Sequence, residues 1–311
     1  MGTRRFGRYT VETSNEEKLL FPGDGITKGD VLDYYDGAAE GLLRSLERRP
    51  LAVERYPDGI EREGFHQKQV AASAPAWIDR VRVSKRDGGF QELPVCGNRA
   101  TLAYLGNQAC LELHPWLSRR DRPERPDQLV FDLDPPDAGF APVRVAARRV
   151  RRLLEELGLP VFAKLSGSRG LHVVVPLDRS EAFDDVRAFA RDAASLLARR
   201  HADELTTEQR IAKRRGRLYL DVGRNAWAQT AVAAWSLRAR PGAPVAMPIR
   251  WDELRDARLD ARAFDRGRAL RRLASDGDPW RGMMRRACSL SRARELLSRL
   301  REQAPARDGC P

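Results

Sequence analysis

The sequence predicts an α/β fold of the α+β kind, because the elements of its second half follow the order strand, helix, strand, strand, helix, strand. Runs of apolar residues predict the strands, and helical spacing of apolar residues predicts the helices. The strands are expected at 128–134, 161–166, 171–177 and 216–223, and the helices at 141–158 and 181–200. This order is the split βαβ arrangement of ferredoxin-like folds, in which strands one and three are neighbours and strand four flanks strand one.

A mixed module precedes this series. Strands are expected at 77–84 and 89–95, and helices at 28–46 and 98–109. The segment SRRDRPERPDQ at 118–128 is charged and contains two prolines, which favours an exposed connection. We therefore expect an N-terminal module over 1–120, a catalytic module over 121–250 and a helical, arginine-rich extension over 251–311. The last helix is expected to be solvated and partly packed rather than dedicated to binding.

Charge and cysteine content narrow the classes of partner. The chain has 311 residues and a formal net charge of +12, mostly from arginine. This charge favours a polyanion such as nucleic acid, although a GC-rich genome would also raise the arginine count. Cys96, Cys110, Cys288 and Cys310 form no C-x-x-C pair, so neither a zinc site nor a disulfide framework is indicated. With no membrane-length apolar segment and no signal core, a cytoplasmic, nucleoid-associated protein is expected.

Two carboxylates mark the first predicted strand of the catalytic module. Asp132 and Asp134 in VFDLDPP are two residues apart, so they share one face of the strand. Carboxylates that share a face repel unless a cation lies between them, and oxygen ligands favour Mg²⁺ or Mn²⁺. The alternative is that these acids cap a turn before Pro135 and Pro136.

Strand order brings other polar residues to the same place. Asp221 ends the fourth strand and His172 begins the third, and both strands neighbour the strand of Asp132. One face of the sheet could therefore gather three carboxylates and an imidazole. Taken alone, Asp221 could pair with Arg224 or cap a turn, and His172 could be an ordinary core histidine.

The turn between the second and third strands has the composition of a polyphosphate site. Ser166, Gly167, Ser168 and Gly170 offer hydroxyl and backbone N–H groups, while Lys164 and Arg169 add positive charge. A plain hairpin would also favour glycines here. Arg238, seventeen residues after Asp221, could return to the same face as a triphosphate clamp.

A second set of candidates lies near the N-terminus. Asn15, Lys18 and Lys28 surround a helix that begins after Thr27, and a helix N-terminus with lysines can hold a phosphate. The alternatives are a simple N-cap and solvated lysines. Phe65 and His66 could stack on a nucleic-acid base, or the aromatic ring could pack beneath a loop.

Together these motifs resemble the polymerase domain of bacterial ligase D, in the archaeo-eukaryotic primase superfamily. The resemblance rests on FDLDP, SGSRGLHVVVPL, LYLD with the following TAVAAWSLRARPGAPVAMPIRWDEL, and the N-terminal SNEEKLLFPGDGITKGDVLDYY, RYPDGI and ELHPW. It extends from about residue 9 to residue 298. The fold it implies is the primase fold, with a catalytic sheet like that of an RNA-recognition motif.

The resemblance implies a template-dependent nucleotidyltransferase of non-homologous end joining that adds nucleotides, preferentially ribonucleotides, at DNA breaks or gaps. It implies that Asp132, Asp134 and Asp221 hold two divalent cations, Mn²⁺ or Mg²⁺, and that Ser166, His172 and Arg238 contact the nucleoside triphosphate. His114 matches an active-site position, and Arg214 matches a position that supports bridging of DNA ends. Asn15, Lys18 and Lys28 would bind the 5′-phosphate, and Phe65 would stack near the template.

Some positions depart from the family pattern. Members commonly have a basic residue where Glu54 stands and two aromatics where Phe65 and His66 stand, and either change could weaken DNA contacts. No ligase or nuclease segment is present, so a stand-alone protein or an excised domain is expected, with a separate ATP-dependent DNA ligase and a Ku-like protein as possible partners. Two alternatives stay open: a primase or gap-filling polymerase outside end joining, and a non-catalytic module that binds DNA ends.

Overall fold

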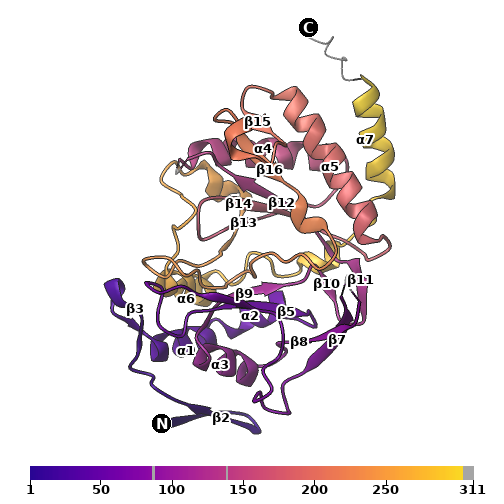
Figure 1. Cartoon of the computed structure of the whole chain (residues 1–311). Helices are drawn as coiled ribbons and strands as arrows, with labels where there is room; N and C mark the ends of the chain where they lie inside the picture. The colour runs from indigo at the N-terminus through magenta and orange to yellow at the C-terminus, as the bar shows by residue number, and fades with distance from the viewer. Residues whose placement is uncertain (86–87, 138, 304–311) are drawn as a thin grey trace.

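The computed structural model describes residues 1–85, 88–137 and 139–303 and has an α/β architecture of two stacked parts (Figure 1). The predicted α/β class is therefore confirmed. Cys310 and the end of the predicted C-terminal extension lie outside the described residues. Among the described residues, no helix has the length and apolar character needed to cross a membrane.

The upper part in Figure 1 is built on a six-stranded sheet with the strand order β15-β16-β12-β14-β13-β17. Strand β12 pairs antiparallel with both β14 and β16, and β13 pairs antiparallel with β14. The expected neighbours of the Asp132 strand are thus confirmed. The bounds are β12 Gln128–Asp134, β13 Phe162–Leu165, β14 Leu171–Pro176, β15 Leu205–Thr206, β16 Leu218–Asp221 and β17 Pro248–Ile249.

Two amphipathic helices cover one face of this sheet, α4 (Ala141–Glu156) and α5 (Phe183–Arg200) (Figure 1). Helix α4 buries Val143, Ala147, Val150 and Leu154, whose spacing places them on one stripe. Glycine at position 158, with a φ of 78°, follows the end of α4 as the pattern predicted. Because the helices cover one face, the opposite face is left to carry polar side chains.

The lower part contains the N-terminal strands and helices. Its central sheet has the order β6-β5-β9, and hairpins β1-β2, β3-β4 and β7-β8 surround it. The strand bounds are β1 Gly2–Phe6, β2 Tyr9–Thr13, β3 Leu19–Phe21, β4 Ile26–Thr27, β5 Leu51–Arg55, β6 Phe65–Gln67, β7 Arg80–Ser84, β8 Phe90–Pro94 and β9 Cys110–Pro115; the helices are α1 Lys28–Gly37, α2 Ala39–Leu46 and α3 Arg99–Asn107. The single helix expected over 28–46 is therefore divided at Ala38.

The segment 118–128 is largely exposed, as its charge suggested, but it is an ordered hairpin with buried ends and not a plain connection. It forms a hairpin of β10 (Ser118–Arg119) and β11 (Arg122–Pro126), and Asp127 after it is fully buried. Asp127 accepts two hydrogen bonds from the buried Arg49, at 2.6 and 2.8 Å, and one from Arg119 at 2.8 Å. Because the buried carboxylate of Asp127 has two guanidinium partners, the end of this charged segment is held in a fixed position.

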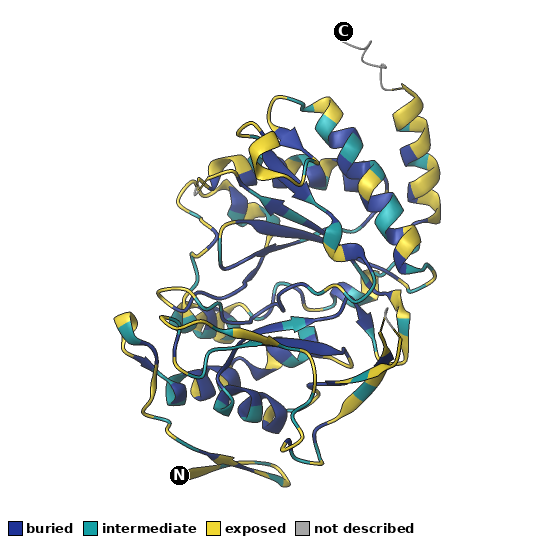
Figure 2. Ribbon diagram, viewed as in Figure 1, coloured by how far each residue is buried: buried dark blue, intermediate teal, exposed yellow. Residues whose placement is uncertain are grey.

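The segment 230–238 lies between the two parts and connects them. The Ala233 N–H donates to the Leu113 carbonyl, and the Leu113 N–H donates to Ser236 Oγ. Trp235 is fully buried, and its carbonyl accepts a hydrogen bond from Tyr34 Oη at 2.7 Å. Figure 2 shows buried residues running through both parts and the layer between them. This packing fixes the position of Arg238 at the end of the segment.

The C-terminal extension is only partly helical. It contains α6 (Arg266–Ser275), α7 (Ser291–Gln303) and short 3-10 turns, of which one covers Met283–Arg286. Helix α7 packs beside α5 at the edge of the upper part, burying Ala293 and Leu297 and leaving most of its arginines exposed (Figures 1 and 2). The expectation of a solvated, partly packed final helix is confirmed.

Candidate active site

A row of four polar residues crosses the sheet on the face opposite α4 and α5. Asp221, Asp132, His172 and Lys164 are successive cross-strand partners on β16, β12, β14 and β13. Directly opposite residues on antiparallel strands have side chains on the same face, about 5 Å apart. The sheet therefore brings together the acids and the imidazole that the sequence predicted for one face.

The centre of this row is electrostatically unfavourable without a cation. Burial raises the pKa of Asp132 to about 6, with further contributions from the neighbouring charges of Asp221 and Asp134, while Arg224 opposes the shift. His172 Nε2 lies 3.5 Å from Asp132 Oδ1. Burial holds the pKa of His172 well below its usual range, so this imidazole is neutral at physiological pH. A neutral ring adds no positive charge, so Arg224, 3.9 Å from Asp132 Oδ2, is the side-chain cation that compensates Asp132.

Asp134 differs from Asp132 and Asp221 in its hydrogen-bond partners. Its Oδ1 accepts a hydrogen bond from Arg169 at 3.0 Å, and its Oδ2 accepts one from Arg214 at 2.9 Å. Asp221 Oδ1 instead accepts the Gly223 N–H at 2.7 Å. Within the described residues, the three aspartates do not form a group whose ligand atoms all lie within 4.8 Å of one another. A cation bridging them would need Asp134 to exchange its arginine partners for the ion.

The glycines of the turn are required by close packing. Gly167 has a φ of 67°, and a Cβ there would lie 2.7 Å from Arg238 Cγ. A Cβ on Gly170 would lie 2.0 Å from the carbonyl oxygen of Leu133, far inside contact distance. The turn therefore lies directly against the end of β12 that carries the aspartates.

Ser166 organises this turn from within. Its Oγ accepts the N–H groups of Ser168 and Gly170, at 3.2 and 3.0 Å, and its carbonyl accepts a hydrogen bond from Arg238 Nη1 at 2.8 Å. Two of the N–H groups expected to face a phosphate are thus used inside the turn. The Ser166 hydroxyl hydrogen and the free guanidinium edges of Arg169 and Arg238 are the donors left for a ligand.

Lys164 is almost completely buried at the end of the cross-strand row. Its Nζ donates to the carbonyl of Val232 in the connecting segment. Burial, with the nearby charge of Arg238, lowers the pKa of Lys164 to about 7. This lysine therefore lies beside the pocket as a group that can exist with or without its proton near neutral pH.

These residues line a pocket of about 170 Å³ between the two parts of the molecule. Its walls come from β9, β12, the 166–172 turn and the segment 224–238, and include His114, Asp132, Asp134, Ser166, Arg169, His172, Arg224 and Arg238. The pocket wall mixes the two kinds of group, since Arg169 pairs with Asp134 and Arg224 lies beside Asp132, whereas Arg238 pairs with Glu112. Such a pocket suits a ligand that carries both a polyphosphate and divalent cations.

Some residues of this region were not predicted as functional. Arg224 lies 3.9 Å from Asp132 Oδ2, although the sequence suggested only a pairing with Asp221. Glu112 pairs with Arg238 Nε at 2.9 Å and with His114 Nε2 at 3.2 Å. The only signal for Glu112 was its spacing of two from His114, which puts both side chains on one face of β9.

The N-terminal candidates also come together. The Lys28 N–H donates to the Lys18 carbonyl, and the Lys18 N–H donates to the Asn15 carbonyl. Helix α1 begins as predicted, with Thr27 and Asp30 forming a capping box. Lys18 Nζ pairs with Asp58 at 2.8 Å, and burial lowers the pKa of Lys28. The structure thus brings the three residues into one corner at the start of α1, where Asp58 pairs with Lys18 and Glu16 lies near Lys28.

The remaining candidates lie on the surface or at the aspartates. Phe65 is 47% exposed, with the Arg55 guanidinium 5.3 Å from its ring centroid, so it is not covered by a loop. His66 Nε2 lies 3.2 Å from Glu54. Arg214, expected to contact DNA ends, is buried against Asp134 and the Tyr219 ring instead of facing outward.

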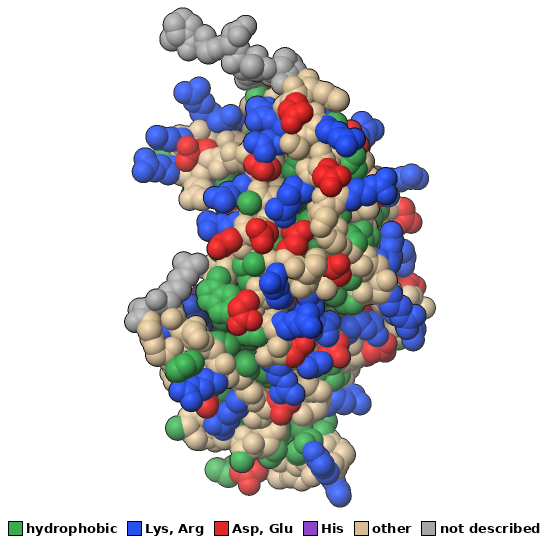
Figure 3. Space-filling view, turned by 90° about the vertical axis from the view of Figure 1, so that its right-hand side faces the viewer, with side chains coloured by type: hydrophobic (Ala, Val, Ile, Leu, Met, Phe, Trp, Pro, Cys, Tyr) green, Lys and Arg blue, Asp and Glu red, His purple; other side chains and the backbone are tan. Residues whose placement is uncertain are grey.

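Basic side chains are not confined to the pocket. Figure 3 shows Lys and Arg spread over the full height of the side that carries α7, with Asp and Glu among them. On this face, net charge alone marks no continuous path for nucleic acid.

Comparison with known proteins was made on sequence and on structure. A family model described as "LigD, primase-polymerase domain" matches residues 27–280. The LigD end-joining repair protein of Mycobacterium tuberculosis is 34% identical over 317 residues, covering 99% of this chain and 39% of that protein. The bifunctional LigD of Bacillus subtilis is 32% identical over 274 residues, covering 87% of this chain and 43% of that protein.

The fold agrees with this relationship. A solved structure, the polymerase domain of Mycobacterium tuberculosis ligase D in complex with DNA, superposes with a TM-score of 0.83 at 33% identity, covering 89% of this chain and 99% of that one. The chain spans less than half the length of these curated relatives. The match over most of its length confirms the predicted relationship: the chain belongs to the LigD primase-polymerase domain family.

Proposed function

We propose that this chain is a template-dependent nucleotidyltransferase that extends primer 3′-hydroxyl ends at DNA breaks or gaps during non-homologous end joining. The observation that carries the proposal is the cross-strand row from Asp221 through Asp132 to His172, facing a pocket that Arg169 and Arg238 also line. Carboxylates for cations and guanidinium groups for phosphates are the two requirements of phosphoryl transfer.

The oxygen donors of Asp132, Asp134 and Asp221 fit Mg²⁺ or Mn²⁺, and the raised pKa of Asp132 is the signature of a site that lacks its counter-charge. Two such ions, when bound, would activate the primer hydroxyl and neutralise the leaving pyrophosphate. Arg169 and Arg214 now neutralise Asp134. If an ion were bound by that carboxylate, Arg169 at the pocket wall would become available for a phosphate, whereas Arg214 would keep its hydrogen bonds to the carbonyls of Glu208 and Gln209.

The triphosphate is assigned to the turn and its surroundings. Arg238 holds the Ser166 carbonyl and reaches the pocket, where its charge and that of Arg169 would orient the phosphates. Gly167 permits the close approach of Arg238. His172, neutral and buried, and Lys164, beside it in the row, would complete the nucleotide contacts together with His114 at the pocket wall.

The DNA contacts are assigned to the N-terminal part. Asn15, Lys18 and Lys28 form the corner proposed to receive a downstream 5′-phosphate, and the exposed Phe65 is available to stack on a template base. Arg214 would reach DNA ends only after it leaves Asp134. A separate ATP-dependent ligase and a Ku-like protein are the proposed partners, and the nucleoid is the proposed location.

The test is nucleotide incorporation on a gapped duplex with and without a 5′-phosphate, comparing ribonucleotides with deoxynucleotides and Mn²⁺ with Mg²⁺. We expect incorporation to favour ribonucleotides and to rise with the 5′-phosphate. Equal activity on both gaps would favour a primase or gap-filling polymerase outside end joining. DNA binding without any incorporation would identify a non-catalytic module that binds ends. Binding is also expected to weaken steeply with salt, because phosphate contacts release counterions.

A further inference from the structure

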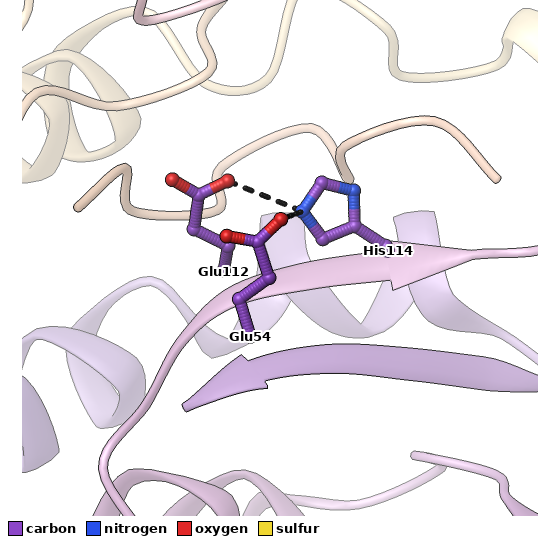
Figure 4. A group of neighbouring side chains, drawn as sticks. All are labelled: Glu54, Glu112 and His114. Carbon is purple, nitrogen blue, oxygen red and sulfur yellow. Dashed lines mark hydrogen bonds and ion pairs between the residues drawn. The ribbon is translucent and has the colours of Figure 1, made fainter. Parts of the chain in front are cut away.

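We infer that Glu54, Glu112 and His114 form a second cation site, for a borderline divalent transition ion such as Zn²⁺. Of the described residues, these are the ones that form a group of at least three His, Cys, Asp or Glu with ligand atoms all within 4.8 Å of one another. Figure 4 shows both carboxylates directed at the same nitrogen of the His114 ring. The site shares no carboxylate with the row on β12 and β16, but it borders the nucleotide pocket, because His114 also lines that pocket and Glu112 pairs with Arg238. An ion there would engage His114 in place of the nucleotide contact proposed for it.

The backbone fixes this convergence. Glu54 on β5 and Glu112 on β9 are directly opposite in an antiparallel ladder, and His114 lies two residues beyond Glu112 on the same face. His114 Nε2 is 3.2 Å from Glu112 Oε2 and 3.6 Å from Glu54 Oε1. Ligands bound at about 2.0–2.2 Å around a tetrahedral ion are separated by about 3.3–3.6 Å. The observed separations agree with that spacing.

In each carboxylate, the oxygen that does not face His114 accepts a hydrogen bond that fixes the orientation of the group. Glu54 Oε2 accepts a hydrogen bond from Tyr56 Oη at 3.1 Å, and Glu112 Oε1 accepts the Ala239 N–H at 2.9 Å. In both residues the second oxygen is the one that faces His114. Hydrogen bonds that fix one oxygen of a carboxylate orient the other toward an ion, which is the usual outer support of metal ligands. In Glu112 the oxygen that faces His114, Oε2, also lies 2.9 Å from Arg238 Nε, so an ion there would share this oxygen with Arg238 or displace it.

A cation would remove an electrostatic cost. Like charges directly opposite on a sheet are destabilising, and these side chains are shielded from water, with exposed fractions of 20% for Glu54 and 4% for Glu112. Arg238 compensates Glu112 from the pocket side, at 2.9 Å, but Glu54 has only histidine rings and Tyr56 among its side-chain partners here. An ion beside His114 would therefore mainly compensate Glu54, because Glu112 already has Arg238 as a partner.

The fourth ligand is available from His66. Its Nε2 lies 3.2 Å from Glu54 Oε1, its side chain is 67% exposed, and its ring centroid is 6.4 Å from that of His114. A rotation of this exposed ring would complete a set of four ligand atoms, namely two imidazole nitrogens and two carboxylate oxygens. Mixed nitrogen and oxygen ligands favour zinc over magnesium, whereas the all-oxygen row on β12 and β16 favours the reverse. The two sites are therefore distinguishable by metal.

The experiment measures zinc binding by calorimetry in the chelator-treated full chain carrying Asp132→Asn and Asp134→Asn, which disables the row on β12. We expect one Zn²⁺ per chain, and an affinity at least ~10-fold weaker after Glu54→Gln, which preserves the shape of the side chain. Glu124→Gln is the matched control, since Glu124 is an exposed strand glutamate on β11, and it should change nothing.

A second measurement locates the ion without any variant. Crystals of the unmodified chain soaked in zinc should show an anomalous peak at the zinc edge between Glu54, Glu112 and His114. Absence of binding, binding that Glu54→Gln leaves unchanged, or a peak elsewhere would overturn the inference. In that case His114 serves only as a hydrogen-bond donor between two glutamates.

Discussion

Asp132 on β12 and Asp221 on β16 lie directly opposite each other in an antiparallel ladder, and His172 is the partner of Asp132 on its other side. Because opposite residues share a face, the register alone places two acids and an imidazole side by side. Burial then raises the pKa of Asp132 to about 6 instead of stabilising its charge. The two carboxylates of this pair therefore favour binding of a cation, and the proposed activity depends on that cation.

Lys164 should make stability depend on pH. Its pKa is about 7 in the folded protein and 10.5 when unperturbed, so between these values the unfolded chain keeps a proton that the folded chain has released. Stability from this group therefore rises with pH, by at most ~1.4 kcal/mol per pH unit. Urea unfolding at pH 7, 8 and 9 should show a steeper rise for the natural chain than for Lys164→Met. Parallel curves would show that Lys164 keeps its proton when buried.

Gly170→Ala should be strongly destabilising, because a Cβ would lie 2.0 Å from the Leu133 carbonyl oxygen and force the turn away from β12. We expect the free energy of unfolding to fall by ~2 kcal/mol or more. Gly97→Ala is the control: its Cβ would meet no atom within 4 Å, and its effect should stay within ~0.5 kcal/mol. Chemical denaturation measures both, and equal effects would contradict the packing described here.

Two aspartates near the β10-β11 hairpin offer a matched pair for a stability test. Asp127 is fully buried between Arg49 and Arg119, so Asp127→Asn should cost ~3–5 kcal/mol by leaving buried charge uncompensated. Asp121 pairs with Arg179 at a side-chain exposure of 33%, and Asp121→Asn should cost less than ~1 kcal/mol. Thermal or urea unfolding separates the two. A small effect at Asp127 would show that its pairs with Arg49 and Arg119 do not anchor this segment.

Lys18 and Lys28 should determine the response to a 5′-phosphate. Replacing both by alanine removes two cationic donors from the corner at the start of α1. Charge-assisted hydrogen bonds contribute ~1.5–3 kcal/mol each, so losing two should lower the affinity for a phosphorylated gap ~100-fold or more. Fluorescence anisotropy on gaps with and without the phosphate measures the effect. The preference for the phosphate should disappear, whereas Arg299→Ala on α7 should keep it; an unchanged preference would locate the phosphate elsewhere.

Much of the fold could be predicted because its signals are local. The apolar run around Asp132 and the periodicity of α4 each specify one element, and strand order then follows from a connectivity with few alternatives. That order was enough to place Asp132, His172 and Asp221 on neighbouring strands. The register that makes them direct partners depends on packing between strands and became visible only in the structure.

Other features depend on contacts between distant segments. Arg214 and Asp134 are 80 residues apart in the sequence, and Arg49 and Asp127 are 78 residues apart. No local sequence pattern therefore predicts either pair. The division of the predicted helix at Ala38 directly follows Gly37, a poor helix former, although the apolar spacing over 28–46 suggested one continuous helix. Glu54 was noticed only as a departure from the family pattern; its position opposite Glu112 comes from the β5-β9 ladder.

The central claim is most directly tested by nucleotide incorporation at a 5′-phosphorylated gap with Mn²⁺, comparing the natural chain with Asp132→Asn. The natural chain should extend the primer, and the variant should lose at least ~10³-fold in rate while still binding the gapped duplex, because only the proposed cation ligand is removed. Incorporation by the variant at the natural rate would contradict the account, since the cross-strand pair of Asp132 and Asp221 would then not hold the catalytic ions.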